Sequence, residues 1–368
     1  MADLRELVRP DLDWDYLYRA AQRHGLLPLL HSHLHGLAAV PADFRQRLQT
    51  HARANAVHNL QLGGELLQLL QLFDAHALPA LPFKGPTLAA LAYGNLALRE
   101  FGDLDLLMPQ SQLPRAKALL LERGYRVAYP LSPRQETAYL RTIRQLPLLR
   151  DDGCVVELHT ALTPRAFRFP LETAGLWRRR GAVPVLGRPV PAPAAEDLLL
   201  ILCMHGAKHR WVNLGWVCDV AELLRACPAI DWRAVLRRAR QVRGRRLLLL
   251  GLDLARRLLG TALPAGVERQ VRADAVVGSL ARDVCRRLFA EKGEKAAGLA
   301  SAWFHLRVRE RLGDGLAFAV SLALEPTPAD WDAAPEWLPW RDYLRRPLRL
   351  AAKYARAMYP GDRLRANS

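Results

Sequence analysis

Two aspartates separated by one residue, Asp103 and Asp105, are the side chains whose type and spacing most suggest chemistry. They lie in the segment Gly102-Asp-Leu-Asp-Leu-Leu-Met108, whose alternation of polar and apolar residues predicts a half-buried strand. In a strand, residues i and i+2 project from one face, so both carboxylates point one way while Leu104 and Leu106 point into a core. Two neighbouring carboxylates repel each other. A divalent cation relieves that repulsion, because carboxylate oxygens bind Mg²⁺, which in turn holds substrate phosphates.

Glu157, in a second alternating segment, supplies a third carboxylate if its strand lies beside that of the aspartates. Three carboxylates on one sheet face can hold two metal ions about 4 Å apart, one activating the attacking oxygen and one stabilising the leaving phosphate. An Asp-x-Asp pair alone is a weak signal, because it also occurs on solvated sheet edges. We therefore take Asp103, Asp105 and Glu157 together as the candidate catalytic residues and metal ligands, with Mg²⁺ or Mn²⁺ as the ion.

Lys84 and Gly85 follow a short apolar segment and predict a turn after a strand. Glycine lets backbone N–H groups approach a phosphate closely, and a neighbouring lysine can neutralise it. A plain strand-ending turn with a solvated lysine is the alternative. Arg99, four residues before Asp103, either binds the triphosphate or forms an ion pair with that aspartate. We count Lys84, Gly85 and Arg99 as candidate nucleotide-binding residues.

His205 and His209 are spaced i and i+4, which places them on one face of a predicted helix, with Lys208 beside them. The spacing suits a zinc pair, but the glutamate of the His-Glu-x-x-His pattern and a third ligand are missing. We expect His205, Lys208 and His209 to line the nucleotide cleft, with Trp211 able to stack on a base. Packed or helix-capping histidines are the alternative.

The elements that must position these residues follow from hydrophobic periodicity. Apolar residues recur at helical spacing over residues 14–77, and from residue 194 the pattern is helical almost to the end. Between them, an Asp152-Gly153 turn joins two short strand patterns and predicts a hairpin. A serine cap at Ser111 predicts the start of a helix. The expected organisation is a helical arm (1–77), an α/β core (78–160), a proline- and arginine-rich connector (161–193) and a helical domain (194–368).

Composition narrows the class of protein. The 368 residues are 51% hydrophobic and 24% charged, which is ordinary for a globular chain. No apolar run approaches the ~20 residues of a membrane span, and no signal peptide is visible. Five cysteines without a CxxC pair fit a reducing cytoplasm. The net charge of +17 attracts polyanions. Nucleic acid is a possible partner but is not favoured, because the basic residues are scattered along the chain.

The sequence resembles an uncharacterised bacterial nucleotidyltransferase family of the polymerase-β-like superfamily. Three stretches carry the resemblance: Phe83-Lys-Gly-Pro-Thr-Leu88 followed by Tyr93, Arg99 and the Asp-x-Asp strand; the arm segment from His24 to Leu30; and His205-Gly-Ala-Lys-His-Arg-Trp211 with Trp216-Val-Cys-Asp219. The superfamily pattern of a glycine turn, an Asp-x-Asp strand and a later acid falls on Gly85, Asp103, Asp105 and Glu157. The turn departs from the usual Gly-Gly or Gly-Ser.

The resemblance implies an α+β fold, with a polymerase-β-like core and a small mixed sheet flanked by the helical arm and the helical domain. It also implies a metal-dependent enzyme that transfers a nucleoside monophosphate from an NTP to a small molecule, peptide or protein and releases pyrophosphate. Some members accompany peptide-tailoring gene clusters. Two alternatives stay open: a catalytically silent nucleotide-binding or scaffold protein of a tailoring or toxin-antitoxin system, and an RNA-modifying nucleotidyltransferase. Steep salt dependence of RNA binding would indicate the last.

Overall fold

The computed structural model describes residues 7–9, 11–129, 131–290 and 298–324. Its α-helices are α2 (Trp14–Arg23), α3 (Leu27–Leu34), α4 (Ala42–Ala75), α5 (Gly85–Leu88), α6 (Leu113–Glu122), α7 (Pro133–Thr142), α8 (Thr173–Arg179), α9 (Ala195–Lys208), α10 (Leu214–Ala226), α11 (Trp232–Gln241), α12 (Arg245–Leu259), α13 (Ala265–Ala273), α14 (Ala275–Leu288), α15 (Gly298–Arg307) and α16 (Leu312–Leu324). Its strands are β1 (Leu81–Pro82), β2 (Asp103–Leu107), β3 (Arg126–Val127), β4 (Gln145–Leu149), β5 (Val155–His159), β6 (Gly181–Val185) and β7 (Arg188–Ala192).

A five-stranded mixed sheet in the order β1-β2-β5-β4-β3 lies at the centre of the α/β core. Strand β2 runs parallel to β5, whereas β1 pairs with β2, and β4 with β5 and β3, in antiparallel fashion. The hairpin expected at Asp152-Gly153 is present as β4 and β5. Together with the helices around it, this small mixed sheet confirms the expected α+β class.

The two faces of the sheet differ in chemistry because side chains alternate along each strand. Leu104 and Leu106 of β2, with Val156 and Leu158 of β5, join a buried apolar cluster that includes residues of α4 and α6. The acidic residues of the same strands therefore project from the opposite face, where they line a cleft together with residues of α9 and α10. The expected orientation of Leu104 and Leu106 is confirmed.

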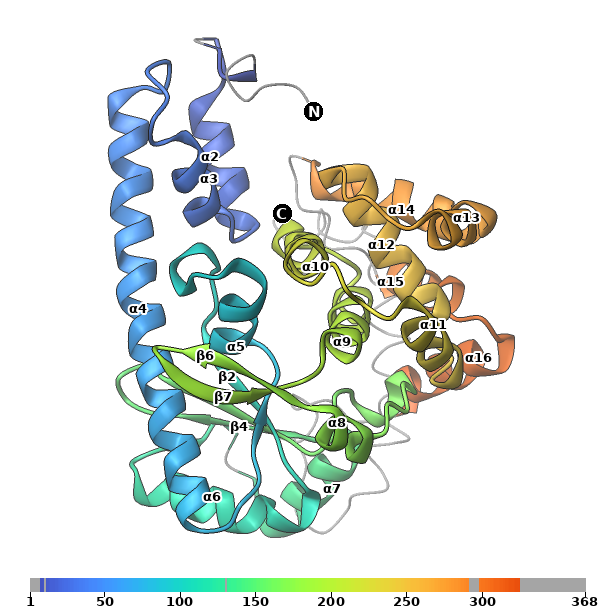
Figure 1. Cartoon of the computed structure of the whole chain (residues 1–368). Coiled ribbons are helices and arrows are strands. Elements are labelled where there is room, and N and C mark those ends of the chain that lie inside the picture. Colours follow the sequence, from blue (N-terminus) through green and yellow to red (C-terminus); the bar gives the residue numbers. More distant parts are fainter. Residues whose placement is uncertain (1–6, 10, 130, 291–297, 325–368) are drawn as a thin grey trace, which may run out of the picture.

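The long helix α4 runs along one side of the molecule and connects the arm to the core (Figure 1). Its two central glycines weaken the helical pattern in the sequence, yet the helix is continuous. Gly63 packs so closely that an added Cβ would lie 3.1 Å from the Leu186 side chain. Buried Asn59 donates hydrogen bonds to the carbonyls of Leu96 and Arg99 and so fixes the loop before β2.

Helices α9 to α14 share a second hydrophobic core. Trp211, which follows α9, is fully buried in it and packs against Gly206, where an added Cβ would lie 2.5 Å from the indole ring. Helix α9 therefore ends in a fixed position, with its last turn facing the polar side of the sheet. No helix of the described ranges combines the length and apolar character that a membrane crossing requires.

Two local expectations are corrected. Ser111 does not cap a helix: it lies in a short 3₁₀ turn (Gln110–Gln112), and α6 begins at Leu113. The proline- and arginine-rich segment 161–193 is more than a linker, since it contains α8 and the β6–β7 hairpin. Its prolines alternate with inward valines, so a two-stranded ladder forms despite them. The helix break expected at 326–339 lies outside the described residues.

Candidate active site

A cleft of about 410 Å³ lies between the polar face of the sheet and helices α9 and α10. Its acidic wall comes from β2 and β5, and its basic and aromatic wall comes from α9, α10 and the turn after β1. Every candidate residue identified from the sequence lines this cleft: Lys84, Gly85, Arg99, Asp103, Asp105, Glu157, His205, Lys208 and His209. The fold thus brings all nine together; their roles stay predictions.

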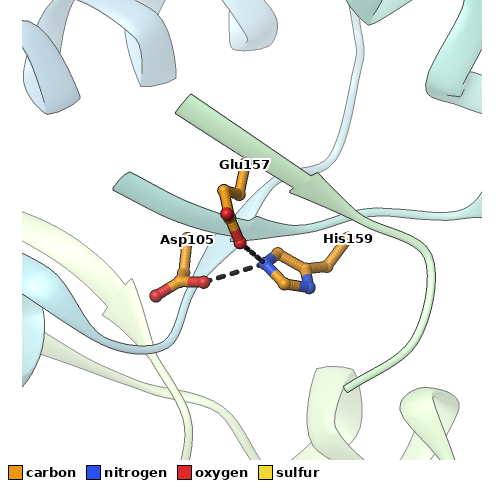
Figure 2. Close-up of side chains that lie close together, drawn as sticks. All are labelled: Asp105, Glu157 and His159. Carbon is orange, nitrogen blue, oxygen red and sulfur yellow. Dashed lines mark hydrogen bonds and ion pairs between the residues drawn. The ribbon is translucent and has the colours of Figure 1, made fainter. Parts of the chain in front are cut away.

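The register of β2 and β5 places two of the carboxylates side by side. Asp105 is directly opposite Glu157 in the parallel pair. His159, two residues beyond Glu157 on the same face, lies between them: its Nε2 is 2.8 Å from Asp105 Oδ1 and 3.2 Å from Glu157 Oε2 (Figure 2). The ring of Phe83 packs edge-on against this imidazole, with ring centroids 5.1 Å apart, and holds its orientation.

Lys84 also points into the acidic group. Its Nζ lies 3.0 Å from Asp105 Oδ2, so this aspartate, which is 2% exposed, contacts a cation through each oxygen when His159 is protonated. Gly85 has a φ of +55°, and an added Cβ would lie 3.1 Å from the Asp103 carbonyl oxygen. Only glycine fits this turn without strain, because both the left-handed conformation and the contact exclude a side chain.

Asp103 is the unpaired member of the group. Among the described residues, no hydrogen bond or ion pair to its carboxylate occurs. Burial, followed by the charge of Asp105, raises the pKa of Asp103 to about 6, although Lys84 counteracts this. Because Asp103 is buried next to another negative charge, a bound cation would stabilise its ionised form.

The pKa values of Asp105 and His159 shift in the directions that favour the charged form of each. Burial favours the neutral form of Asp105, but Lys84 and His159 outweigh it and lower its pKa far below the ordinary value. Burial likewise lowers the pKa of His159, but its hydrogen bonds to Asp105 and Glu157 raise it by more, so the net shift is upward. Without a metal, Asp105 is therefore anionic and the imidazole is stabilised as imidazolium.

Arg99 is bound by a residue that sequence reasoning did not assign to it. Its guanidinium forms a two-pronged contact with Asp219 of α10, with distances of 2.7 and 3.0 Å, and the Tyr93 hydroxyl donates to the same carboxylate. The ion pair therefore joins Arg99 to Asp219, and the predicted pair with Asp103 does not form. Because Asp219 is 4% exposed, this network fastens the loop before β2 to the helical half.

The last turn of α9 forms the wall opposite the carboxylates. The rings of His205 and His209 each lie within 5.3 Å of the Trp216 ring. Burial and the nearby ammonium groups lower the pKa of both histidines, that of His209 to about 4, so both rings are neutral near pH 7. Burial and Lys84 also lower the pKa of Lys208, which Glu157 and Asp105 partly offset.

One expectation for this wall is wrong. Trp211 cannot stack on a base in the cleft, because it is fully buried in the helical core. Trp216, from the next helix, is the tryptophan that lines the cleft, together with Phe83 and Phe101. The backbone turns left-handed at Arg210 and Trp211, and this reversal carries the indole away from the cleft.

Sequence reasoning missed His159 and Asp219. The signal for His159 was present, because a residue two positions after Glu157 in an alternating strand lies on the same face. Asp219 ends one of the stretches that carry the family resemblance, but no role was assigned to it: its partner Arg99 is 120 residues away in the chain, and only tertiary packing joins them.

The donor set suits a divalent cation. One ligand atom each from Asp105, Glu157 and His159 lie within 4.8 Å of one another, and unpaired Asp103 opens into the same cleft. Carboxylate oxygens are ligands for Mg²⁺ and Mn²⁺, and an imidazole is an additional ligand that Mn²⁺ accepts more readily than Mg²⁺ does. The arrangement can therefore hold a cation beside Lys84, where phosphate oxygens would also be attracted.

A family model described as uncharacterised nucleotidyltransferase matches residues 10–260, more than half of the chain. The chain belongs to this family. The match confirms the family that the sequence resembles, and it identifies the protein as a nucleotidyltransferase enzyme. The matched range contains the sheet, the acidic group and the α9–α10 wall of this nucleotidyltransferase. No curated protein matches the chain.

Solved structures are similar to the nucleotidyltransferase at low identity. A lincosamide antibiotic adenylyltransferase bound to lincomycin is 17% identical, with a TM-score of 0.29 over 37% of this chain and 83% of that one. ANT(2″)-Ia in complex with adenylyl-2″-tobramycin is 15% identical, with a TM-score of 0.35 over 50% and 97%. A nucleotidyltransferase-like protein from Paracoccidioides brasiliensis is 15% identical, with a TM-score of 0.33 over 56% and 95%. These scores are low, so the assignment rests on the family match.

Proposed function

We propose that this nucleotidyltransferase is metal-dependent and moves a nucleoside monophosphate from an NTP to a hydroxyl or similar group of an acceptor. The observation that carries the proposal is the convergence of three carboxylates on one sheet face. Asp105 and Glu157 are opposite each other in the β2–β5 register, and Asp103 lines the same cleft with no hydrogen-bond or ion-pair partner among the described residues. Lys84 and His159 offset part of the repulsion, and the raised pKa of Asp103 indicates that negative charge remains which a bound cation would stabilise.

We assign Asp103, Asp105 and Glu157 as the residues that would hold Mg²⁺ or Mn²⁺. When bound, the ion supplies positive charge that stabilises the charge developing on the phosphate oxygens. His159 is a further candidate ligand or, if it stays protonated, a positioning residue that keeps the Asp105 and Glu157 oxygens aligned. The Asp105 contact holds Lys84 at the mouth of the acidic group, where its ammonium can also reach a phosphate.

The remaining residues bind the nucleotide in this proposal. The turn at Gly85 leaves room for the triphosphate beside the Lys84 ammonium, and Lys208 provides a second cation from the opposite wall. The base would lie against Trp216 and the two neutral histidine rings, because aromatic surfaces stack on nucleobases. Arg99, fully engaged with Asp219, positions the loop before β2 and contributes charge to the cleft.

The chemical step is an in-line substitution at the α-phosphorus. The acceptor oxygen forms a new bond to phosphorus, the bond from the α-phosphorus to the oxygen that bridges to the β-phosphate breaks, and pyrophosphate leaves. A carboxylate of the acidic group, which we assign as Glu157, accepts the proton of the acceptor hydroxyl. Lys84 and Lys208 stabilise the negative charge that accumulates on the leaving group.

Transfer from NTPs labelled at the α-phosphate tests the proposal. The full chain is incubated with each NTP, Mg²⁺ and pooled small-molecule, peptide and protein acceptors, with EDTA in a parallel reaction. We expect a labelled product that disappears with EDTA and with Asp103→Asn, and that persists with Asp151→Asn, a matched change at an aspartate whose side chain is 93% exposed. Saturable NTP binding without product from any pool would instead support the silent nucleotide-binding protein.

A further inference from the structure

A second hollow, of about 450 Å³, is lined by four arginines that the active-site chemistry does not use. Arg144 precedes β4, and Arg243 lies between α11 and α12. Arg165 begins a short 3₁₀ helix after β5 (Arg165–Phe167), and Arg168 follows it directly. One acid, Asp314 of α16, lies among them. The four arginines come from three separate parts of the chain, so the fold itself concentrates the charge.

Most of this charge is not neutralised by the residues that the structure describes. Arg243 pairs with Asp314 at 3.0 Å. Within the described ranges, the side chains of Arg144, Arg165 and Arg168 form neither an ion pair nor a hydrogen bond. Arginines elsewhere are commonly paired: buried Asp197, for example, binds two of them. Three arginines that lack such a partner among the described residues therefore line one hollow.

The backbone gives an independent sign of function at the same place. Arg144, Arg168 and Arg243 have φ values of 62°, 50° and 55°. They are three of the seven non-glycine residues with positive φ in the part of the chain that the structure describes. Such conformations are strained for residues other than glycine, and they cluster at active sites and ligand-binding segments. Their concentration around this hollow indicates that the directions of these arginines matter.

The hollow adjoins the active-site cleft through the chain itself. Gln145 and Leu162 line the cleft. Their immediate neighbours in the chain, Arg144 before Gln145 and Thr163 after Leu162, line the arginine hollow. Thr160 N–H donates to the Arg144 carbonyl at 2.9 Å and ties these two segments together. Because consecutive Cα atoms are about 3.8 Å apart, the backbone segments that line the two hollows are immediate neighbours.

We propose that the arginine hollow binds phosphate or carboxylate groups of the acceptor, so that the acceptor of this enzyme is an anionic small molecule. The inference rests on the proposed nucleotidyl transfer and adds the chemical class of its second substrate. Guanidinium groups match phosphate and carboxylate oxygens in two-pronged contacts. The volume suits part of a small molecule, and an acceptor with several amino groups would be repelled. The acceptor hydroxyl then extends into the cleft toward the acidic group.

The first test measures anion binding with the cleft filled. Calorimetric titration of inositol hexakisphosphate into the full chain, saturated with Mg²⁺ and a non-hydrolysable ATP analogue, should show binding. Arg165→Gln/Arg168→Gln should weaken it about tenfold or more, the loss expected for removing charge-assisted contacts. The matched pair Arg178→Gln/Arg188→Gln removes the same charge from exposed positions outside the hollow and should change it less than twofold. Equal affinity in the wild type and the Arg165/Arg168 variant would overturn the proposal.

The second test identifies the acceptor class. A metabolite extract is divided into anionic and cationic fractions by ion exchange, and each is incubated with enzyme, Mg²⁺ and labelled NTP. Product from the anionic fraction, lost in Arg165→Gln/Arg168→Gln while binding of the ATP analogue is unchanged, supports the proposal. Product from the cationic fraction alone overturns it. Failure of nucleotidyl transfer itself is distinguishable: the ATP analogue would not bind and neither fraction would be labelled, although the arginines would still bind inositol hexakisphosphate.

Discussion

Asp103→Asn should stabilise the metal-free protein at neutral pH. The change keeps the shape of the side chain and removes one charge from a cleft that also contains Asp105 and Glu157. The pKa of Asp103 rises from 3.8 to about 6 in the folded chain, which at about 1.4 kcal/mol per pH unit corresponds to about 3 kcal/mol. The carboxylate is partly exposed and therefore partly screened by solvent, so we expect about 1–2 kcal/mol.

The pH dependence has a defined sign. The folded chain holds the Asp103 proton more tightly than the unfolded chain does, so unfolding releases it between about pH 4 and pH 6. The free energy of unfolding of the wild type therefore falls, through this group, as the pH rises across that window. Asp103→Asn lacks this fall. The difference between the two proteins should be small near pH 4 and largest above pH 6.

Denaturant unfolding in EDTA at several pH values measures this difference, with Asp151→Asn as the control for loss of an exposed charge. A companion thermal assay adds Mg²⁺ and NTP, which raise Tm by binding the folded state. The ligand-induced rise should be large in the wild type and in Asp151→Asn, and should largely disappear in Asp103→Asn. A pH-independent difference together with equal ligand-induced rises would refute the reasoning, because Asp103 would then be neither repelled by its neighbours nor a ligand.

Three further outcomes are expected. Lys84→Ala should weaken NTP binding by about 1.5–3 kcal/mol in calorimetric titration. It should also destabilise the metal-free protein, because buried Asp105 loses its lysine partner. Unchanged NTP affinity would mean that Lys84 has a structural role only. Glu157→Gln should lower transfer by several orders of magnitude in the labelled-NTP assay with a smaller loss of NTP affinity, and comparable losses in both would argue against a role in proton transfer. Asp219→Asn should lower the free energy of unfolding in urea by about 3 kcal/mol, since it weakens a buried ion pair. A loss of NTP affinity with unchanged stability would instead show that Arg99 acts on the nucleotide.

Local pattern was enough to locate the acidic group. Alternation along two strands placed Asp103, Asp105 and Glu157 on polar faces and Leu104 and Leu106 in a core, because a strand has a strict period of two. The turn residues Asp152 and Gly153 identified the hairpin for the same reason: both signals depend on neighbours within a few residues.

Contacts between distant segments were beyond the reach of such patterns. Two tryptophans, Trp211 and Trp216, follow the same histidine motif, and nothing in their spacing says which one lines the cleft. The choice depends on the left-handed backbone at Arg210 and on the space that Gly206 leaves for an indole. The sequence likewise did not indicate that Asp219 is the partner of Arg99, because the two meet only where α10 packs against the loop before β2.

The class of chemistry could be predicted from the sequence, since carboxylates at strand spacing after a lysine-glycine turn, together with the family that the sequence resembles, indicate nucleotidyl transfer. The folded structure was needed to show that β2 and β5 are parallel neighbours in a register that sets Asp105 opposite Glu157, and that His159 lies between them. It was also needed to show that arginines from three parts of the chain line one hollow. The physical reason is that strand pairing and hollow formation are long-range events. They depend on which buried surfaces fit together across the whole chain, and local sequence does not encode that fit.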